Sequence, residues 1–376
     1  MKNISIIIPC RNEAKYIEEC MMSVLEFALP NDVDFEVLIM DGRSNDATVE
    51  LAIKKAKQDP RIRILENPGL IQSTAMNIGV KASQGDWIMR LDAHSKYPAN
   101  YLSLCLETAL RSGADNVGGQ FITEPGAKGY SAQLVQALTT HKFGVGNSGF
   151  RTSDKEEWTD TVPYGFYRRE VFDWIGWMDE RLVRAQDYEF NRRIVASGGR
   201  IFRNPNIQVC YYNQPSIGAF YYKQFVKEAP YNAYMWYLAP YAFAPRHAVT
   251  GLFAAGVLGG IALAPFFPQS IGLAFYIVMA FYAILAILSS IQQAIRYKEI
   301  RHIFFLPFAF FLYHLIHGLG LWAGFLRLAT FTAPVQKINE PWPGAGFRRL
   351  HPHSNIKTWR ELGVPAVNHT VDARNA

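Results

Sequence analysis

Strand-like and helix-like segments alternate along the first 210 residues. Short apolar runs typical of buried strands occupy 4–9, 35–41, 61–67 and 86–92, and residues with helical spacing follow at 12–28, 45–58 and about 72–82. This βαβα order predicts an α/β fold with a mostly parallel sheet. Ligands of such sheets bind at the carboxyl ends of the strands, so chemistry is expected there.

The second half of the chain is far more apolar. No Asp, Glu, Lys or Arg occurs from 248 to 295, and Pro265, Pro268 and Gln269 divide this run into two stretches. Another uncharged run covers 303–325. Each stretch is close to the roughly 20 residues that a bilayer core requires, which predicts transmembrane helices at 248–267, 270–292 and 303–326. A pair of buried helices in a soluble protein is the alternative.

Charged and aromatic residues indicate how these spans are oriented in the membrane. The basic segment 292–302 favours the cytoplasm. Aromatic residues mixed with Lys and Pro at 220–243 are typical of an interfacial segment. We expect no signal peptide, because "MKNISIIIPC" enters a strand directly. The tail after the third span then lies outside. It contains Arg348, Arg349, Lys357 and Arg360, which leave a re-entrant third segment open.

These patterns divide the chain into four parts. We expect a cytoplasmic catalytic domain at 1–212, an interfacial aromatic segment at 213–247, membrane helices within 248–326, and a C-terminal tail at 327–376. Within the third span, Gly320 and Gly324 form a GxxxG pattern that favours close helix packing. His314 and His317 share one face of this helix, where hydrogen bonding inside the bundle is favoured over a metal pair.

Composition narrows the possible partners. The net charge is +6, but no basic run carries the interleaved aromatics of an RNA-binding motif, so a nucleic-acid partner is excluded and anionic lipid is favoured. The four cysteines are widely spaced, which is typical of reduced thiols and argues against structural zinc.

Three carboxylates fall where strands end or a helix begins: Asp41, Asp92 and Asp187. A nucleotide-sugar site needs an acceptor for the uracil N–H, a cation on the diphosphate, and a base for the attacking hydroxyl. Taken singly, each acid could instead be a solvated or helix-capping carboxylate.

Two further residues accompany Asp92. Arg90 lies on the same strand face, where it either contacts phosphate or neutralises Asp92. His94 stands where an Asp-x-Asp metal motif would have its second carboxylate, and a neutral imidazole is a competent ligand for first-row cations. An exposed loop histidine is the alternative.

The chain resembles the family 2 glycosyltransferases, whose fold is the GT-A-type nucleotide-diphosphosugar transferase fold, over about residues 3–210. The resemblance rests on "SIIIPCRNEAKYI", "EVLIMDGRSNDAT", "NIGVKASQGDWIMRLDAH" and "VPYGFYRREVFDWIGWMDERLVRAQDYEFNRRI", in this order. More narrowly, "GVGNSGFR" and the Asp-Ala-His resemble the group containing succinoglycan-biosynthesis glucosyltransferases, which also carry C-terminal membrane helices.

The resemblance implies roles for single residues. It places Pro9, Arg11, Glu13 and Asp41 in the nucleotide pocket, with Asp41 on the uracil. Asp92 and His94 would hold a divalent cation, Mn²⁺ or Mg²⁺, and Asp187 would be the catalytic base of an inverting displacement. The matched segments also contain Asn77, Arg90 and Arg184, which together with Asp92 complete the donor-binding set we expect.

The implied enzyme is an inverting hexosyltransferase that moves a sugar, with glucose suggested by the resemblance, from a UDP-sugar to a polyprenyl-diphosphate-linked saccharide. It would act in exopolysaccharide or other surface glycan synthesis, as a multi-pass protein of the bacterial inner membrane. Gly42 and Gln186 depart from the family pattern, and no Gln-x-x-Arg-Trp motif of processive synthases is present. The alternatives are a polyprenyl-phosphate sugar synthase and a catalytically silent polysaccharide-assembly membrane protein.

Overall fold

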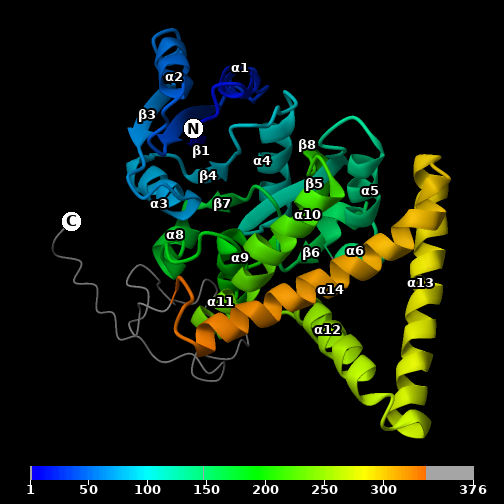
Figure 1. The fold of residues 1–376 in the computed structure, drawn as a ribbon. Helices are drawn as coiled ribbons and strands as arrows, with labels where there is room; N and C mark the ends of the chain where they lie inside the picture. Colours follow the sequence, from blue (N-terminus) through cyan, green and yellow to red (C-terminus); the bar gives the residue numbers. More distant parts are fainter. Residues whose placement is uncertain (1, 147, 336–376) are drawn as a thin grey trace.

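A single eight-stranded sheet organises the first part of the chain in the computed structural model, which describes residues 2–146 and 148–335 (Figure 1). The strand order is β3-β2-β1-β4-β7-β5-β8-β6. The strands are β1 (Lys2–Cys10), β2 (Val33–Asp41), β3 (Ile62–Glu66), β4 (Trp87–Arg90), β5 (Asn116–Glu124), β6 (Glu157–Thr159), β7 (Phe166–Arg168) and β8 (Ile201–Tyr212).

The sheet is mostly parallel, as the alternating pattern predicts. Strands β1 to β4 pair in parallel, as do β5 and β8. The short strand β7 runs antiparallel between β4 and β5, and β6 is antiparallel at the edge. The helices of this part are α1 (Ile17–Leu25), α2 (Thr48–Ala56), α3 (Gln72–Ala82), α4 (Tyr101–Ser112), α5 (Tyr130–Thr139), α6 (Lys142–Val145), α7 (Gly149–Thr152), α8 (Arg169–Ile175) and α9 (Gln186–Ala196).

Helices cover both faces of the sheet, which explains why its central strands are continuously apolar. Along β1, Ile6 and Ile8 pack with α1 and α4, whereas Ile7 packs with α3, α8 and α9 on the opposite face. The carboxyl ends of β1, β2 and β4 therefore meet at one edge, where polar loops replace the core.

Three long apolar helices follow, and each is long and apolar enough to cross a membrane. The elements after β8 are α10 (Ile217–Tyr222), the π-helical turn η1 (Lys223–Glu228), α11 (Ala229–Leu238), the 3-10 turn η2 (Pro240–Ala242), α12 (Pro245–Leu263), the π-helical turn η3 (Pro268–Gly272), α13 (Leu273–Tyr297) and α14 (Arg301–Ala329). The residues expected to be interfacial are thus largely helical.

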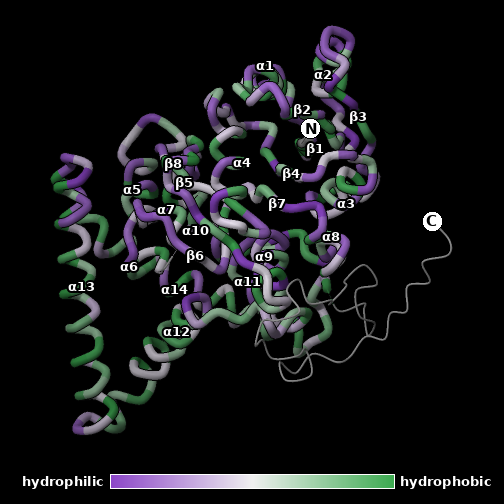
Figure 2. Tube along the Cα trace, turned by 180° about the vertical axis from the view of Figure 1, so that it is seen from behind, coloured by the Kyte–Doolittle hydropathy of each residue, from purple (hydrophilic) through white to green (hydrophobic). Residues whose placement is uncertain are grey.

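Helices α12 and α13 form a hairpin that projects away from the sheet domain, and its surface is largely hydrophobic (Figures 1 and 2). Large apolar side chains are exposed along it, among them Leu252, Phe266 and Phe281. Water would not solvate such a surface favourably over this length, whereas lipid would.

Helix α14 packs against the sheet domain as well as against the hairpin. It contacts α5, α10, η1 and α11 as well as α12 and α13, and it crosses the lower side of the domain in Figure 1. Its GxxxG pattern faces the interfacial helices: a Cβ at Gly320 would lie 2.9 Å from the Phe225 carbonyl oxygen, and one at Gly324 would lie 2.9 Å from Pro230. The expected close-packing face is confirmed, and its partner is the segment that precedes the spans.

The expected boundaries between the four parts of the chain, at residues 212, 247 and 326, stay a prediction. The part of the expected tail from residue 336 onward, which contains Arg348, Arg349, Lys357 and Arg360, lies outside the described residues.

Candidate active site

Two loops at the carboxyl edge of the sheet are joined by hydrogen bonds. The Asn12 side chain accepts from the Asn45 N–H at 2.9 Å, and the Asn12 N–H donates to Ser44 Oγ at 2.9 Å. The Glu13 N–H donates to Thr48 Oγ1 at 2.7 Å. Asn12 itself has a φ of +58°, a conformation that asparagine tolerates better than most residues. The β1–α1 and β2–α2 loops thus form one rigid wall.

Asp41 lies in this wall as the last residue of β2. Its carboxylate accepts the Ser44 N–H at 3.3 and 3.2 Å, and it is 8% exposed. Cys10 is its register partner on β1, and burial together with the Asp41 charge raises the pKa of that thiol to about 12. Pro9 precedes Cys10 in β1 and is the register partner of Met40, the residue before Asp41.

Gly42 fits this wall for a steric reason. A Cβ at position 42 would lie 3.3 Å from both the Cys10 carbonyl oxygen and Arg11 Cβ, so a second Asp would press on the loop. Arg11 is exposed and lies along Gly42.

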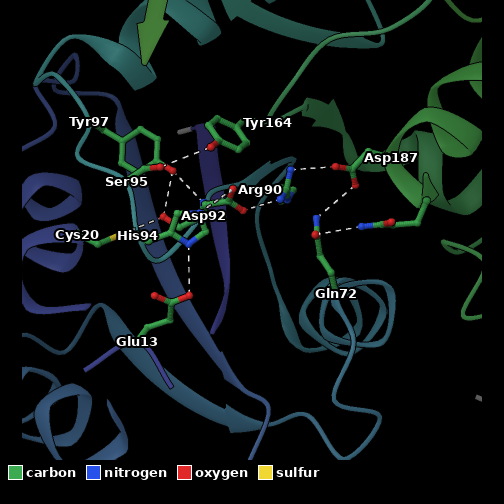
Figure 3. A network of polar contacts seen from close by, with 11 residues as sticks. Glu13, Cys20, Gln72, Arg90, Asp92, His94, Ser95, Tyr97, Tyr164 and Asp187 are labelled. Atoms are coloured by element: carbon green, nitrogen blue, oxygen red, sulfur yellow. Dashed lines mark hydrogen bonds and ion pairs between the residues drawn. The ribbon is translucent and has the colours of Figure 1, made fainter. Parts of the chain in front are cut away.

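Arg90 connects two of the three expected carboxylates. From the end of β4 it donates to Asp92 Oδ1 at 2.5 Å and to Asp187 Oδ2 at 3.0 Å, and Asp187 comes from the start of α9 (Figure 3). Only 7% of the Arg90 side chain is exposed, and its guanidinium lies over the Tyr164 ring. The structure therefore shows one ion pair between Arg90 and Asp92 and a second between Arg90 and Asp187.

Asp187 is held by a second contact that sequence reasoning missed. Gln72 Nε2 donates to Asp187 Oδ1 at 3.3 Å, and Gln186 Nε2 donates to Gln72 Oε1 at 3.0 Å. A glutamate at 186 could not donate to that oxygen, so the departure at Gln186 has a local reason. No sequence signal singled out Gln72, because it lies 115 positions from Asp187.

The environment of Asp187 suits a proton acceptor. Although 33% of its side chain is exposed, withdrawal of water by the surrounding protein raises its pKa, and the charge of Asp92 adds to this effect. Arg90 and Gln72 act in the opposite direction. Asp187 also lies in the first turn of α9, as the alternative of a carboxylate at a helix N-terminus expects, and its side-chain hydrogen bonds go to Gln72 and Arg90 of other elements.

His94 lies beside Asp92 and is oriented by Glu13. Its Nδ1 is 3.3 Å from Glu13 Oε1, and its Nε2 is 3.9 Å from Asp92 Oδ2 (Figure 3). The hydrogen bond to Glu13 raises the pKa of His94. When Nδ1 carries the proton toward Glu13, Nε2 offers its lone pair toward Asp92, as in metal sites where a carboxylate orients a ligating histidine.

This donor set fits a divalent cation bound together with a diphosphate. Asp92 Oδ1 is taken by Arg90, which leaves Oδ2 facing His94. Within residues 2–146 and 148–335, no three His, Cys, Asp or Glu side chains are placed to enclose a cation by themselves. One or two protein ligands suffice when substrate phosphates supply the remaining oxygens.

The polar contacts of Asn77 and Arg184 are with other residues. The Asn77 amide accepts from the Met178 N–H at 2.9 Å and donates to the Met178 carbonyl at 2.9 Å and to Glu180 at 2.7 Å. Its hydrogen bonds therefore fix the loop before α9. Arg184 lies 4.0 Å from Glu228 of η1 and faces the interfacial helices.

The histidines of α14 make hydrogen bonds within the helix bundle. His314 Nδ1 is 2.8 Å from the Tyr282 hydroxyl, and His317 Nδ1 is 2.8 Å from Thr250 Oγ1. The interpretation as bundle hydrogen bonds is confirmed.

The part of the chain that contains this site is similar to known proteins. Residues 5–176 match the family described as "Glycosyl transferase family 2". The succinoglycan biosynthesis protein ExoA of Rhizobium meliloti (strain 1021) is 33% identical over 224 residues, which are 58% of this chain and 66% of that protein. A dolichyl N-acetyl-alpha-D-glucosaminyl phosphate 3-beta-D-2,3-diacetamido-2,3-dideoxy-beta-D-glucuronosyltransferase of Methanococcus voltae is 30% identical over 236 residues, 61% of this chain and 71% of that protein.

Among solved structures, a mannosyltransferase from Pyrobaculum calidifontis in complex with GDP-Man and Mn²⁺ has a TM-score of 0.54 at 16% identity, covering 88% of both chains. This likeness shows that the two chains share a fold.

Proposed function

Because this chain belongs to glycosyl transferase family 2, we propose that it transfers a sugar from a UDP-sugar to a lipid-linked saccharide, with inversion at the anomeric carbon. The observation that carries this proposal is the convergence of Asp92 and Asp187 on Arg90. It brings a charged ligand and a candidate base to one edge of the sheet from distant parts of the sequence.

Asp187 is the proposed catalytic base. One of its oxygens would take the proton of the acceptor hydroxyl while that hydroxyl attacks the anomeric carbon, and the bond to the diphosphate breaks on the opposite side. Its raised pKa supports this role, because a stronger base accepts a proton more readily. Arg90 keeps the carboxylate ionised and aimed, and Gln72 fixes its rotation.

The donor side would use Asp41, with Pro9 and Arg11 lining the wall beside it, to bind the uracil. Asp92 and His94 would hold a divalent cation, Mn²⁺ or Mg²⁺, with Glu13 orienting the imidazole. Such a cation stabilises negative charge on a departing diphosphate. The complex of the mannosyltransferase neighbour with GDP-Man and Mn²⁺ supports this use of the fold.

The acceptor is proposed to be a polyprenyl-diphosphate-linked saccharide. Three helices that could span a membrane adjoin the sheet domain, and the interfacial helices α10 and α11 pack on one of them. A cytoplasmic site at the inner membrane of a bacterium would then meet the lipid at the surface. Relatives named for succinoglycan biosynthesis and for a dolichyl-linked acceptor support this class.

A donor panel tests the proposal. Purified protein is incubated with membrane-extracted lipid acceptor and one UDP-sugar at a time, with and without Mn²⁺, and we expect one donor to give product. Asp187→Asn should lower the rate by about 100- to 10,000-fold, as loss of a general base does. The exposed Asp173→Asn serves as the matched control.

Two results would contradict the proposal. Activity of Asp187→Asn close to that of the unchanged protein would favour a polyprenyl-phosphate sugar synthase, whose phosphate acceptor needs no strong base. Failure to bind UDP with or without Mn²⁺ would favour a silent assembly protein.

A further inference from the structure

A cluster of charged residues lies where α9 meets the beginning of α12. We call it the junction cluster, and it consists of Asp160, Arg192, Arg246 and His247. Arg246 Nη2 lies 3.0 Å and Arg192 Nη1 lies 3.6 Å from the same Asp160 oxygen, Oδ2. The residues come from three segments of the chain: the end of β6, helix α9 and helix α12.

The junction cluster carries more positive than negative charge. Two guanidinium groups share one carboxylate, whose Oδ2 also accepts a hydrogen bond from the Tyr188 hydroxyl at 3.2 Å. Arg246 lies over the Tyr188 ring, with 5.1 Å from its central carbon to the ring centroid. Among the described residues, the ion pairs of the cluster therefore leave one positive charge without a paired carboxylate, at the domain end of a candidate membrane span.

Two nitrogen atoms of the junction cluster lack hydrogen-bond partners among the described residues. They are Arg192 Nε and His247 Nδ1, and both atoms are inaccessible to solvent. Buried donors and acceptors normally have partners, so the polar groups of the junction cluster are incompletely satisfied by the described residues. The charged side chains themselves remain reachable, with 25% of Arg192, 26% of Asp160 and 19% of Arg246 exposed.

The position of the junction cluster indicates which anion it would meet. Tyr188, which contacts Asp160, Arg246 and His247, directly follows Asp187 in α9. Helix α12 begins at Pro245 and leads away into the apolar hairpin. A lipid-linked acceptor must place its sugar near Asp187 and its isoprenoid chain in lipid, with the diphosphate between them.

We propose that the junction cluster binds the diphosphate of the lipid-linked acceptor. This assignment rests on the proposed function for its choice of lipid. Guanidinium groups are suited to phosphate because they offer paired N–H donors in one plane and stay charged at all working pH values. Asp160 holds both arginines in place before the lipid arrives, and the negatively charged diphosphate supplies the counter-charge that Asp160 alone does not.

Lipid binding is the direct test, because it needs no transfer reaction. The full-length protein in nanodiscs is titrated with a polyprenyl diphosphate that carries no sugar, and with the neutral polyprenol of equal length. We expect at least about tenfold preference for the diphosphate, the value of one charge-assisted hydrogen bond. Arg246→Gln and Arg192→Gln should each remove most of this preference, and Arg246→Lys should retain part of it.

Arg301→Gln is the matched control. Arg301 is also a membrane-proximal arginine paired with one acid, Glu299, but it is the first residue of α14, after the turn from α13. Its loss should leave the preference unchanged. Nanodiscs containing phosphatidylglycerol and solutions of inorganic diphosphate separate the acceptor from other anions, and neither should compete at concentrations where the polyprenyl diphosphate saturates the protein.

The proposal is overturned if the unchanged protein binds polyprenol and polyprenyl diphosphate equally, if phosphatidylglycerol or inorganic diphosphate competes equally well, or if Arg301→Gln abolishes the preference as Arg246→Gln does. The first of these outcomes is measured on the unchanged protein, so it tests the proposal even if the variants fail to fold. If the protein binds the lipid through the junction cluster but transfers no sugar, the proposed function is refuted and the assignment of this binding site stands.

Discussion

Replacing Arg90 with Gln is expected to move the pH at which the enzyme loses activity. Arg90 Nη1 lies 3.0 Å from Asp187 Oδ2, and at an effective dielectric constant of about 20 two such charges attract by about 5 kcal/mol. Asp187 is 33% exposed, so solvent screening reduces the useful part to about 1–3 kcal/mol. This corresponds to a rise of about 1–2 units in the pKa of Asp187 when Arg90 is lost.

The sign of the effect follows from the role of Asp187. A base works only when deprotonated, so activity falls as the pH drops through its pKa. Removal of Arg90 takes away an influence that lowers this pKa and leaves Asp92 to repel the charged form. The acid limb of the kcat/KM profile should therefore move upward by about 1–2 pH units.

A matched variant separates this effect from general destabilisation. Arg90→Gln should also lower the free energy of unfolding by about 3 kcal/mol, because it leaves two carboxylates without their partner. Arg181→Gln breaks a similarly buried ion pair, with Asp179 at 2.6 Å, and should lower stability without moving the acid limb. An acid limb that stays in place in Arg90→Gln, or moves to lower pH, would refute the reasoning.

Three further predictions concern other parts of the molecule. His94→Asp should shift the metal preference from Mn²⁺ toward Mg²⁺, measured as UDP affinity in each ion, and an unchanged ratio would make His94 an ordinary loop residue. Asn77→Ala should cost about 1–3 kcal/mol of unfolding free energy because it strands the Met178 backbone groups, while the donor KM changes little; weaker donor binding at unchanged stability would contradict this. Gly324→Leu should lower the melting temperature in detergent by separating α14 from α11, whereas Gly256→Leu, with no atom within 4 Å of its added Cβ, should not; equal effects would remove the packing argument.

The arrangement of the carboxylates shows how far local pattern extends. Asp41 ends β2 and Asp92 follows β4, as the apolar runs predicted, because a buried strand and the polar loop after it have opposite hydropathy. The contacts between distant parts of the site did not follow from the hydropathy pattern. Glu13 reaches His94 across 81 positions, and Gln72 reaches Asp187 across 115, and nothing in a linear sequence marks such pairs.

Asn77 shows what a motif leaves open. It lies in a segment that resembles the family, and its expected place in the donor-binding set stays a prediction. Its amide engages the Met178 backbone and Glu180, about a hundred positions away. Resemblance locates a residue in a motif, but the hydrogen bonds it makes depend on which loop packs over it.

Three features follow from hydropathy over neighbouring residues and are therefore predictable from the sequence: the mostly parallel α/β sheet, the three long apolar helices and the carboxylates at the sheet edge. Contacts between distant elements appear only in the folded chain, where Arg90 bridges Asp92 and Asp187, α14 lies against the sheet domain, and Arg192 and Arg246 share Asp160. Apolar periodicity specifies that a surface will be buried or in lipid. Packing between elements far apart in the chain decides which other surface covers that apolar surface. It also decides which charged groups then lie within a few ångströms of one another.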